Sequence, residues 1–354
     1  MQPPRYTPLS LAAQTSYAEL FDLARAVELT RSVARLSGSF ASKTVKGRKY
    51  WYYQHRDLAG VIRQFYIGPD DERVRELVTQ ARAEPTEDVG PRARALIALG
   101  GERVLPKHFR VIRRLSEYGF FRAGGVLIGT HAFLSYGNLL GVHWRTGSRT
   151  QDLDFAHAGK NISIALPSTI KVDVPKAIDS LQMGLLPLNA IGGESGVTYL
   201  NPKDPELRLD FLPTLHRGGE QPVVLEQLNV AMQPLKFMEY VLERPTQAAV
   251  FCEDGAVVVT VPSPERYALH KVLVWVERAA SFRTKATKDV LQAAALIAYF
   301  AAERPGELTT AWDDLVRRGK GWVERARKGI AALSPVAPEL PLSELLPLPT
   351  HRRQ

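Results

Sequence analysis

The chain has 354 residues, of which 45% are hydrophobic and 23% charged, and a formal net charge of +9. This composition is typical of a globular protein with two or three domains and excludes fibrous and disordered classes. With no run of about 18 apolar residues and no signal-peptide core at the N-terminus, we expect a cytoplasmic protein without membrane contact. The positive charge favours nucleic acids or nucleotide phosphates as partners. A single cysteine, Cys252, excludes an internal disulfide, and we expect it to be buried.

The first expected unit, residues 1–102, combines a helix with a basic β-meander. Apolar residues recur at helical spacing over 16–36, β-rich stretches occupy 43–67, and a second helical pattern covers 72–84. Cations and aromatic rings on a hairpin suit single-stranded nucleic acid, since cations meet phosphates while rings stack on bases. The same alternation is typical of any half-buried strand pair, and both interpretations stay open. The residues concerned are Lys43, Lys46, Arg48, Lys49, Trp51 and Tyr53.

The middle unit, residues 103–235, mixes helices and strands without a regular βαβ repeat, which predicts an α+β fold. The last unit, residues 236–354, is expected to be mainly helical, with a β insertion at 256–261 and a proline-rich tail over 335–349. The expected elements of the middle unit are a helix at 107–118, a strand at 126–128, a helix at 130–140 and strands at 152–155 and 207–212.

A glycine turn precedes the second of these helices. Gly124 and Gly129 have the spacing of a phosphate loop, but Thr130 stands where that loop needs its lysine. The better prediction is a buried strand, a turn at Gly129 and a helix that begins near Thr130. The free N–H groups at such a helix start can hold a phosphate, and glycine lets the phosphate approach the backbone closely.

Two aspartates follow on an expected strand. Residues i and i+2 of a strand point the same way, about 6.5 to 7 Å apart, so Asp152 and Asp154 share a face while Leu153 and Phe155 face the core. A third carboxylate, Asp210, stands in a second expected strand. Three carboxylates on adjacent strands can hold two Mg²⁺ ions about 4 Å apart. An isolated D-x-D is more often a surface turn or a helix cap, so its weight depends on this context.

This ordered set resembles the DNA polymerase β-like nucleotidyltransferases, whose signature is a strand, a glycine turn that opens a helix, D-x-D on a strand and a later third acid. The segments 127–133 and 150–155 are similar to the AbiEii-type nucleotidyltransferase toxins and, more closely, to a bacterial family of predicted nucleotidyltransferases. Three departures stand out. The second glycine of the usual pair is replaced, since Ile128 precedes Gly129, and the stretch from Thr130 to Asp152 is longer than in many relatives. Ser148 also stands where the toxin motif has an arginine, with Arg149 one step later.

The resemblance implies a polymerase β-like core, a mixed sheet with flanking helices, that uses an NTP and two Mg²⁺ ions, or Mn²⁺ in their place. It implies that Gly129 and Thr130 contact the nucleotide, while Asp152, Asp154 and Asp210 bind the metals. Asp210 would also assist the acceptor hydroxyl. The basic residues implied to face the triphosphate are Lys271, Arg283, Lys285 and Lys288.

From the residues alone, a solvated helix face is the better explanation of Lys285, whereas Lys271 lies in an apolar run and needs an anionic partner. The predicted function is Mg²⁺-dependent transfer of an NMP from an NTP to an acceptor, with RNA or tRNA favoured over a protein or a small molecule. Two alternatives stay open, a nucleic-acid-binding protein with a vestigial core and a metal-dependent nuclease. The sequence leaves the acceptor, the base of the NTP, a role as a toxin and the oligomeric state undetermined.

Overall fold

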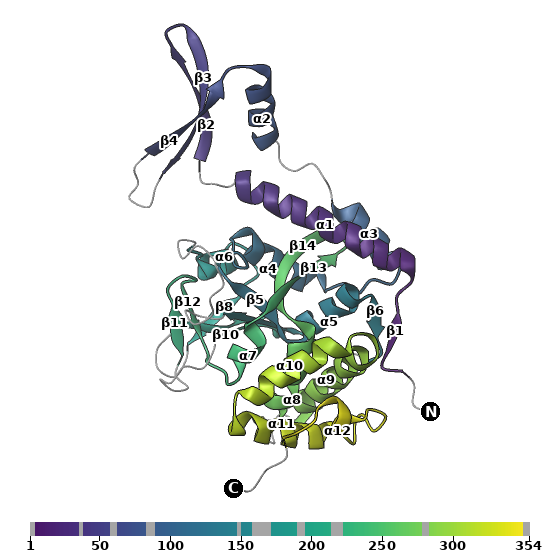
Figure 1. The fold of residues 1–354 in the computed structure, drawn as a ribbon. Helices are drawn as coiled ribbons and strands as arrows, with labels where there is room; N and C mark the ends of the chain where they lie inside the picture. The colour runs from purple at the N-terminus through teal and green to yellow at the C-terminus, as the bar shows by residue number, and fades with distance from the viewer. Residues whose placement is uncertain are drawn as a thin grey trace.

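A computed structural model describes residues 4–34, 38–56, 62–82, 89–146, 150–157, 171–189, 195–213, 222–277 and 283–349. Figure 1 shows a central α/β region, a layer of C-terminal helices against it, and a small sheet that stands beyond the long N-terminal helix. Within the described ranges, no helix combines the length and the apolar character needed to cross a membrane.

A five-stranded mixed sheet forms the centre of the fold, in the order β5-β7-β10-β9-β8. β7 and β10 run parallel, and the other neighbouring pairs are antiparallel. The two strands predicted to carry the aspartates are therefore adjacent, and the mixed sheet agrees with the predicted mixture of helices and strands. The strands are β5 (Gly125–Ile128), β7 (Asp152–His157), β8 (Leu186–Asn189), β9 (Ser195–Asn201) and β10 (Asp204–Pro213).

Side chains alternate across β7 and β10 as the sequence predicts. Leu153, Phe155, Leu209 and Phe211 are fully buried, and the rings of Phe155 and Phe211 stack with centroids 5.5 Å apart. Burying each large apolar side chain contributes about 1.5–3 kcal/mol, and a slip of one residue would place this set on the opposite face. The register that positions the aspartates is therefore fixed by the core beneath them.

In the described ranges the sheet is flanked by α4 (Pro106–Glu117), α5 (Gly129–Leu140) and α6 (Val174–Asp179). The predicted helices at 107–118 and 130–140 are confirmed within one residue at each end. α5 begins directly after β5 and ends at Gly141, which adopts φ +70°, a left-handed conformation that glycine reaches without strain.

A β-hairpin between the sheet and the C-terminal helices was only half predicted. The sequence pattern predicted one β stretch at 256–261, whereas two antiparallel strands pair there, and the second packs beside β5. Cys252, on the first strand, is fully buried as expected, and burial raises the pKa of its thiol. The hairpin strands are β13 (Pro245–Cys252) and β14 (Gly255–Pro262), and the shorter pairs are β1 (Tyr6–Pro8) with β6 (Val142–Trp144) and β11 (Val223–Leu225) with β12 (Val230–Met232).

The C-terminal region is mainly helical, as predicted. Its helices are α7 (Met238–Leu242), α8 (Pro264–Glu277), α9 (Arg283–Glu303), α10 (Pro305–Arg317), α11 (Lys320–Leu333) and α12 (Leu342–Leu345). α11 approaches α8 at Gly329, where a Cβ atom would lie 2.1 Å from the carbonyl oxygen of Val272. The proline-rich tail packs on these helices, since the indole N–H of Trp312 donates to the carbonyl of Pro347 at 2.9 Å.

The N-terminal region contains α1 (Leu11–Ala34), the antiparallel sheet β2 (Gly38–Val45), β3 (Arg48–Arg56) and β4 (Ile62–Pro69), and then α2 (Glu72–Arg82) and α3 (Val89–Ala98). The predicted meander is confirmed. α1 begins at Leu11, five residues before the expected start at 16, and residues 35 and 36 of that prediction lie outside the described ranges. The boundaries at 102 and 235 stay predictions, and β14 beside β5 places residues of the last expected unit against the central sheet.

Candidate active site

The three predicted aspartates lie on one face of two neighbouring strands. In the parallel pairing of β7 with β10, Asp154 is the register partner of Asp210, and Asp152 is the partner of Arg208. Neighbours in register on adjacent strands point to the same side of a sheet. All three aspartates are half-buried, so their carboxylates border the solvent while the apolar residues between them fill the core.

Asp210 is held by its neighbours on the sheet. Its Oδ1 accepts a hydrogen bond from the hydroxyl of Thr198 at 2.7 Å and another from Nε of Arg208 at 2.9 Å. The Arg208 side chain is 44% exposed and that of Asp210 is 15% exposed. In the described part of the chain, no three His, Cys, Asp or Glu side chains gather in a group that could hold a metal ion. The aspartates thus share a face without forming a closed ligand cage in this conformation.

The glycine turn lies directly against the D-x-D strand. Gly129 has φ +65°, and a Cβ atom built there would lie 2.1 Å from Oδ2 of Asp154. Both the left-handed backbone and the missing side chain are therefore needed at this position. The carboxylate of Asp154 consequently lies against the first residue of α5, as expected from the order of the motifs in the sequence.

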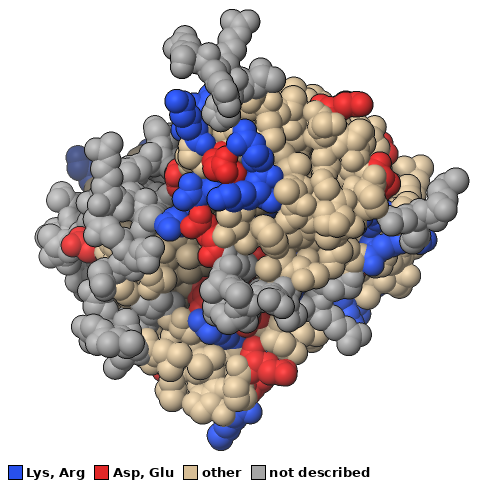
Figure 2. Space-filling view, turned by 90° about the horizontal axis from the view of Figure 1, so that it is seen from below, with Lys and Arg blue, Asp and Glu red and all other residues tan. Residues whose placement is uncertain are grey.

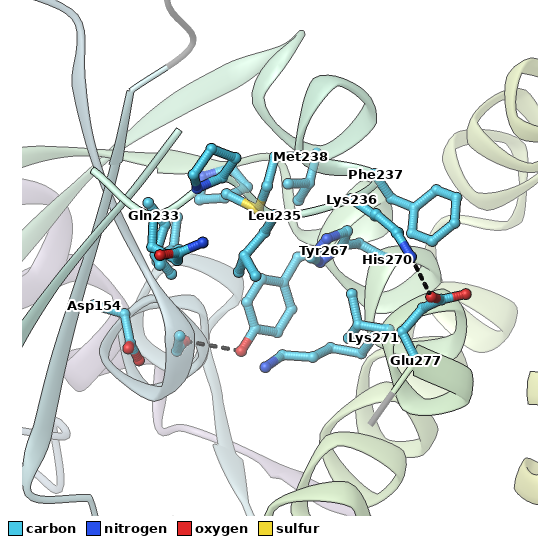
Figure 3. A pocket seen from close by; sticks show the side chains of 17 residues that line it. Asp154, Gln233, Leu235, Lys236, Phe237, Met238, Tyr267, His270, Lys271 and Glu277 are labelled. Carbon is cyan, nitrogen blue, oxygen red and sulfur yellow. Dashed lines mark hydrogen bonds and ion pairs between the residues drawn. The ribbon is translucent and has the colours of Figure 1, made fainter. Parts of the chain in front are cut away.

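A pocket of about 500 Å³ opens beside this contact. Figure 3 shows Asp154 on one side of it and Tyr267 and Lys271, both from α8, on another. The remaining lining is mostly apolar and comes from the end of β10, the segment 233–241 and α8. These residues include Leu212, Pro234, Leu235, Phe237, Met238, Val241 and Val274, with the polar groups of Gln233, Lys236, His270 and Glu277.

Tyr267 links α8 to the glycine turn and to α9. Its hydroxyl lies 2.8 Å from the carbonyl oxygen of Gly129 and 2.9 Å from Oε1 of Gln292, so one proton serves two acceptors. The Gln292 amide in turn donates to Oγ1 of Thr130 at 3.4 Å. Thr130 is buried and does not line the described pocket, so its side chain supports the turn, and its predicted contact with nucleotide stays untested.

Lys271 has its anionic partner within the protein. Its Nζ lies 2.6 Å from Oδ1 of Asp289 on α9, and the ammonium also lies 5.0 Å from the ring centroid of Tyr267. Sequence reasoning expected the triphosphate as the counter-charge and missed Asp289. The pocket still includes Lys271, so the lysine sits between an internal ion pair and open space.

The first turns of α9 supply the other predicted cations. Burial and the neighbouring Lys271 lower the pKa of Lys288, whereas Asp154 and Asp152 act in the opposite direction. This interaction places Lys288 in the field of the two aspartates. Gln292, one turn further along α9 than Lys288, is 1% exposed and belongs to the buried network. The backbones of Arg283 and Lys285 lie at the start of α9, and their side chains fall outside the described part of the structure.

A buried histidine pair lies behind the site. Nδ1 of His108 and Nε2 of His131 are 2.9 Å apart, so one ring donates to the other. Burial lowers the pKa of His108 to about 4 and that of His131 to about 3, and both rings are therefore neutral near pH 7. Since His131 is 2% exposed, its ring packs within the protein.

Sequence reasoning missed several polar residues of the site because each is defined by a distant partner. Tyr267, Asp289 and Gln292 are single polar residues in helical patterns, and their partners lie 18 to 162 positions away. Of these three residues, only Asp289 had a local signal, since it follows Lys288 at the start of a helix. Arg208 carried a stronger signal, because it stands two positions before Asp210 on one strand face.

The comparisons with known proteins give one solved structure of low similarity and one family match. The chain is similar over 69% of its length, with 14% identity and a TM-score of 0.34, to an antigenic nucleotidyltransferase-like protein from Paracoccidioides brasiliensis, of which 94% is covered. No curated protein matches the chain. A family model described as nucleotidyltransferase matches residues 107–317, more than half of the chain, and includes the glycine turn, the three aspartates and the lysines of α8 and α9. The chain therefore belongs to this nucleotidyltransferase family.

Proposed function

We propose that the protein transfers the NMP part of a magnesium-bound NTP to a hydroxyl group of an acceptor. The observation that carries this proposal is the position of Asp154. Its carboxylate contacts Gly129 at the start of α5, faces the described pocket and pairs in register with Asp210. A metal-binding acid, a phosphate-binding helix start and a space for a nucleoside thus meet at one residue.

The proposed metal ligands are Asp152, Asp154 and Asp210. Their chemistry fits Mg²⁺, a hard cation that takes carboxylate oxygens, and their common face fits a shared site. When bound, the metal ions would neutralise phosphate charge and lower the pKa of the attacking hydroxyl. Arg208 supplies a positive charge to Asp210 in the present conformation, which limits the repulsion among three neighbouring acids.

The protein groups around the pocket bind and orient the nucleotide in this proposal. The free N–H groups at the start of α5 face an anion, and the positive end of the helix dipole adds to their attraction. Lys271 and Lys288 add positive charge from α8 and α9, while the apolar walls formed by Leu235, Phe237 and Met238 suit a base and exclude water. Catalysis would then come mainly from positioning and charge neutralisation.

The acceptor is proposed to be RNA, with tRNA included, on the basis of the net charge of +9. The likeness to AbiEii-type toxins and a cytoplasmic location stay predictions. A small-molecule or protein acceptor would use the same transfer chemistry, so only product analysis separates these cases.

The proposal is tested by incubating the protein with each of the four α-labelled NTPs, total cell extract and Mg²⁺, with EDTA in a parallel reaction. We expect label in RNA-sized material, sensitive to ribonuclease and absent with EDTA. Label in protein or in a small product would support NMP transfer but show that the acceptor is not RNA. In a separate reaction with labelled RNA, release of nucleotides, together with no incorporation from the NTPs, would show that the protein is a nuclease and not a transferase.

A further inference from the structure

The small sheet β2–β4 has two chemically different faces. Side chains alternate along β3, so Arg48, Tyr50 and Tyr52 point to one face, and Lys49, Trp51 and Tyr53 point to the other. A bulge in the pairing with β4 places Trp51 opposite Gly68 and Tyr52 opposite Tyr66. The bulge thereby brings Tyr66 to the face of Tyr50 and Tyr52.

α2 covers the Trp51 face. A Cβ atom at Gly68, the partner of Trp51, would lie 2.8 Å from a methyl group of Val74 on α2. The Trp51 indole N–H also donates to Asp70, at the end of β4, at 2.7 Å. Figure 1 shows α2 beside the sheet. The indole N–H of Trp51, one of the rings on which a base could stack, is thus used within the protein.

The opposite face is a platform of tyrosines. The ring of Tyr66 lies 6.1 Å from that of Tyr50 and 5.7 Å from that of Tyr52, and Tyr66 is 58% exposed. The ammonium of Lys43 lies 5.4 Å from the ring of Tyr52 and donates to the side chain of Gln64 at 2.6 Å. Aromatic rings, a cation and an amide therefore share one surface, which we call the tyrosine platform and define as Lys43, Tyr50, Tyr52, Gln64 and Tyr66.

The charge of this sheet has one sign. Segments 38–56 and 62–69 contain six Lys and Arg residues and no Asp or Glu. The face of the molecule in Figure 2 is different, because basic and acidic side chains are intermixed there. A surface of one sign favours a polyanion, and exposed rings among cations favour a polyanion with unpaired bases.

We infer that the tyrosine platform binds single-stranded nucleic acid, with bases stacked on Tyr52 and Tyr66 and phosphates near Lys43 and Arg48. The inference deepens the proposed function, on which it rests, because it gives the acceptor a binding surface. Exposed rings accept a base of any kind, so the platform is expected to bind with little sequence preference.

The test is fluorescence anisotropy of the full chain with labelled oligo-U and oligo-dT of roughly 12 nucleotides. Tyr66→Ala is expected to weaken binding about tenfold, while Tyr66→Phe retains it, because stacking needs the ring and not the hydroxyl. Lys43→Ala should reduce the slope of log Kd against log salt by about 0.7, the value for one phosphate contact on a single strand. Matched controls are Leu186→Ala on β8 and Lys203→Ala in the turn between β9 and β10, both exposed, which should bind like the wild type.

Three results would overturn the inference. The first is that the wild-type protein binds neither probe, and the second is that Tyr66→Ala binds as tightly as Tyr66→Phe. The third is that the protein binds a duplex or polyglutamate as tightly as the single strand. Circular dichroism of each variant shows that the fold is retained. Asp154→Asn should bind the probes like the wild type although it loses NMP transfer. Wild-type protein that binds the probes but transfers no NMP would refute the proposed function alone. Transfer without binding would refute the platform alone.

Discussion

The acidic side of the candidate site is built from two neighbouring strands, whereas its basic side is built from two helices much later in the chain. On the strands, Asp154 and Asp210 are placed by a register that buried neighbours fix. On the helices, Lys271 of α8 is placed by an ion pair with Asp289 of α9. The strand side therefore depends on packing beneath it, and the helix side depends on a buried charge pair.

Because of this difference, substitutions on the strand side should affect mainly activity, and substitutions on the helix side should affect mainly stability. A half-buried carboxylate on a fixed strand can be changed with little cost to folding, since the core below it stays packed. A buried ion pair that loses one member leaves an uncompensated charge, which destabilises the fold. Substitutions on the two sides should therefore give opposite patterns of activity and stability.

The largest effect is expected for Asp154→Asn. A metal ion supplies several kcal/mol of charge stabilisation in the transition state, so NMP transfer should fall at least about 1,000-fold. The midpoint of thermal unfolding should change little. Initial transfer rates and a thermal melt measure both quantities, with Asp254→Asn in the exposed turn of the β13–β14 hairpin as the control. Retained transfer in Asp154→Asn would remove Asp154 from the site.

The next effect is on stability. Asp289→Ala leaves Lys271 without its buried partner and should lower the free energy of unfolding by about 3 kcal/mol. Urea denaturation measures this change. The double variant K271M/D289L, which removes both charges, should recover most of the loss because apolar residues of similar size often replace a buried pair without cost. A single variant as stable as the wild type would show that the pair does not hold α8 to α9.

A smaller effect is expected at Gly129, which packs on Asp154 of the strand side and accepts a hydrogen bond from Tyr267 of the helix side. Gly129→Ala forces a side chain into a left-handed backbone and should cost roughly 1–2 kcal/mol in unfolding free energy. The new Cβ would also displace the Asp154 carboxylate, so transfer should fall with stability. Gly306→Ala, where no atom lies within 4 Å of the new Cβ, is the matched control and should be neutral or slightly stabilising. Full activity in Gly129→Ala would contradict the close packing of Gly129 on Asp154.

The same contrast explains what the sequence could predict. The strand side could be predicted because the alternation of side chains along a strand places Asp152 and Asp154 on one face and Leu153 in the core. The local sequence pattern is enough to determine this arrangement. A neighbouring strand for Asp210 was also predicted, whereas its register opposite Asp154 comes from the structure. The order of glycine turn, D-x-D and third acid then indicated the reaction class.

The helix side could not be predicted from a local sequence pattern. The partner of Lys271 lies 18 residues away on another helix, and Tyr267 bonds to Gly129 across 138 positions. A helical pattern indicates which face is buried, but it does not indicate which distant residue meets a buried polar group. The β2–β4 sheet shows the same limit, since a bulge at Trp51 and Tyr52 determines which tyrosines share the open face.

The central claim is that the protein moves the α-phosphate of an NTP together with its nucleoside. The most direct measurement is a parallel reaction of the wild-type protein with α-labelled and γ-labelled NTP, in Mg²⁺ and extract. The account predicts that the α label enters a larger product and that the γ label leaves as pyrophosphate. Incorporation of the γ label, or release of free NMP from the α-labelled NTP without a larger product, would contradict it.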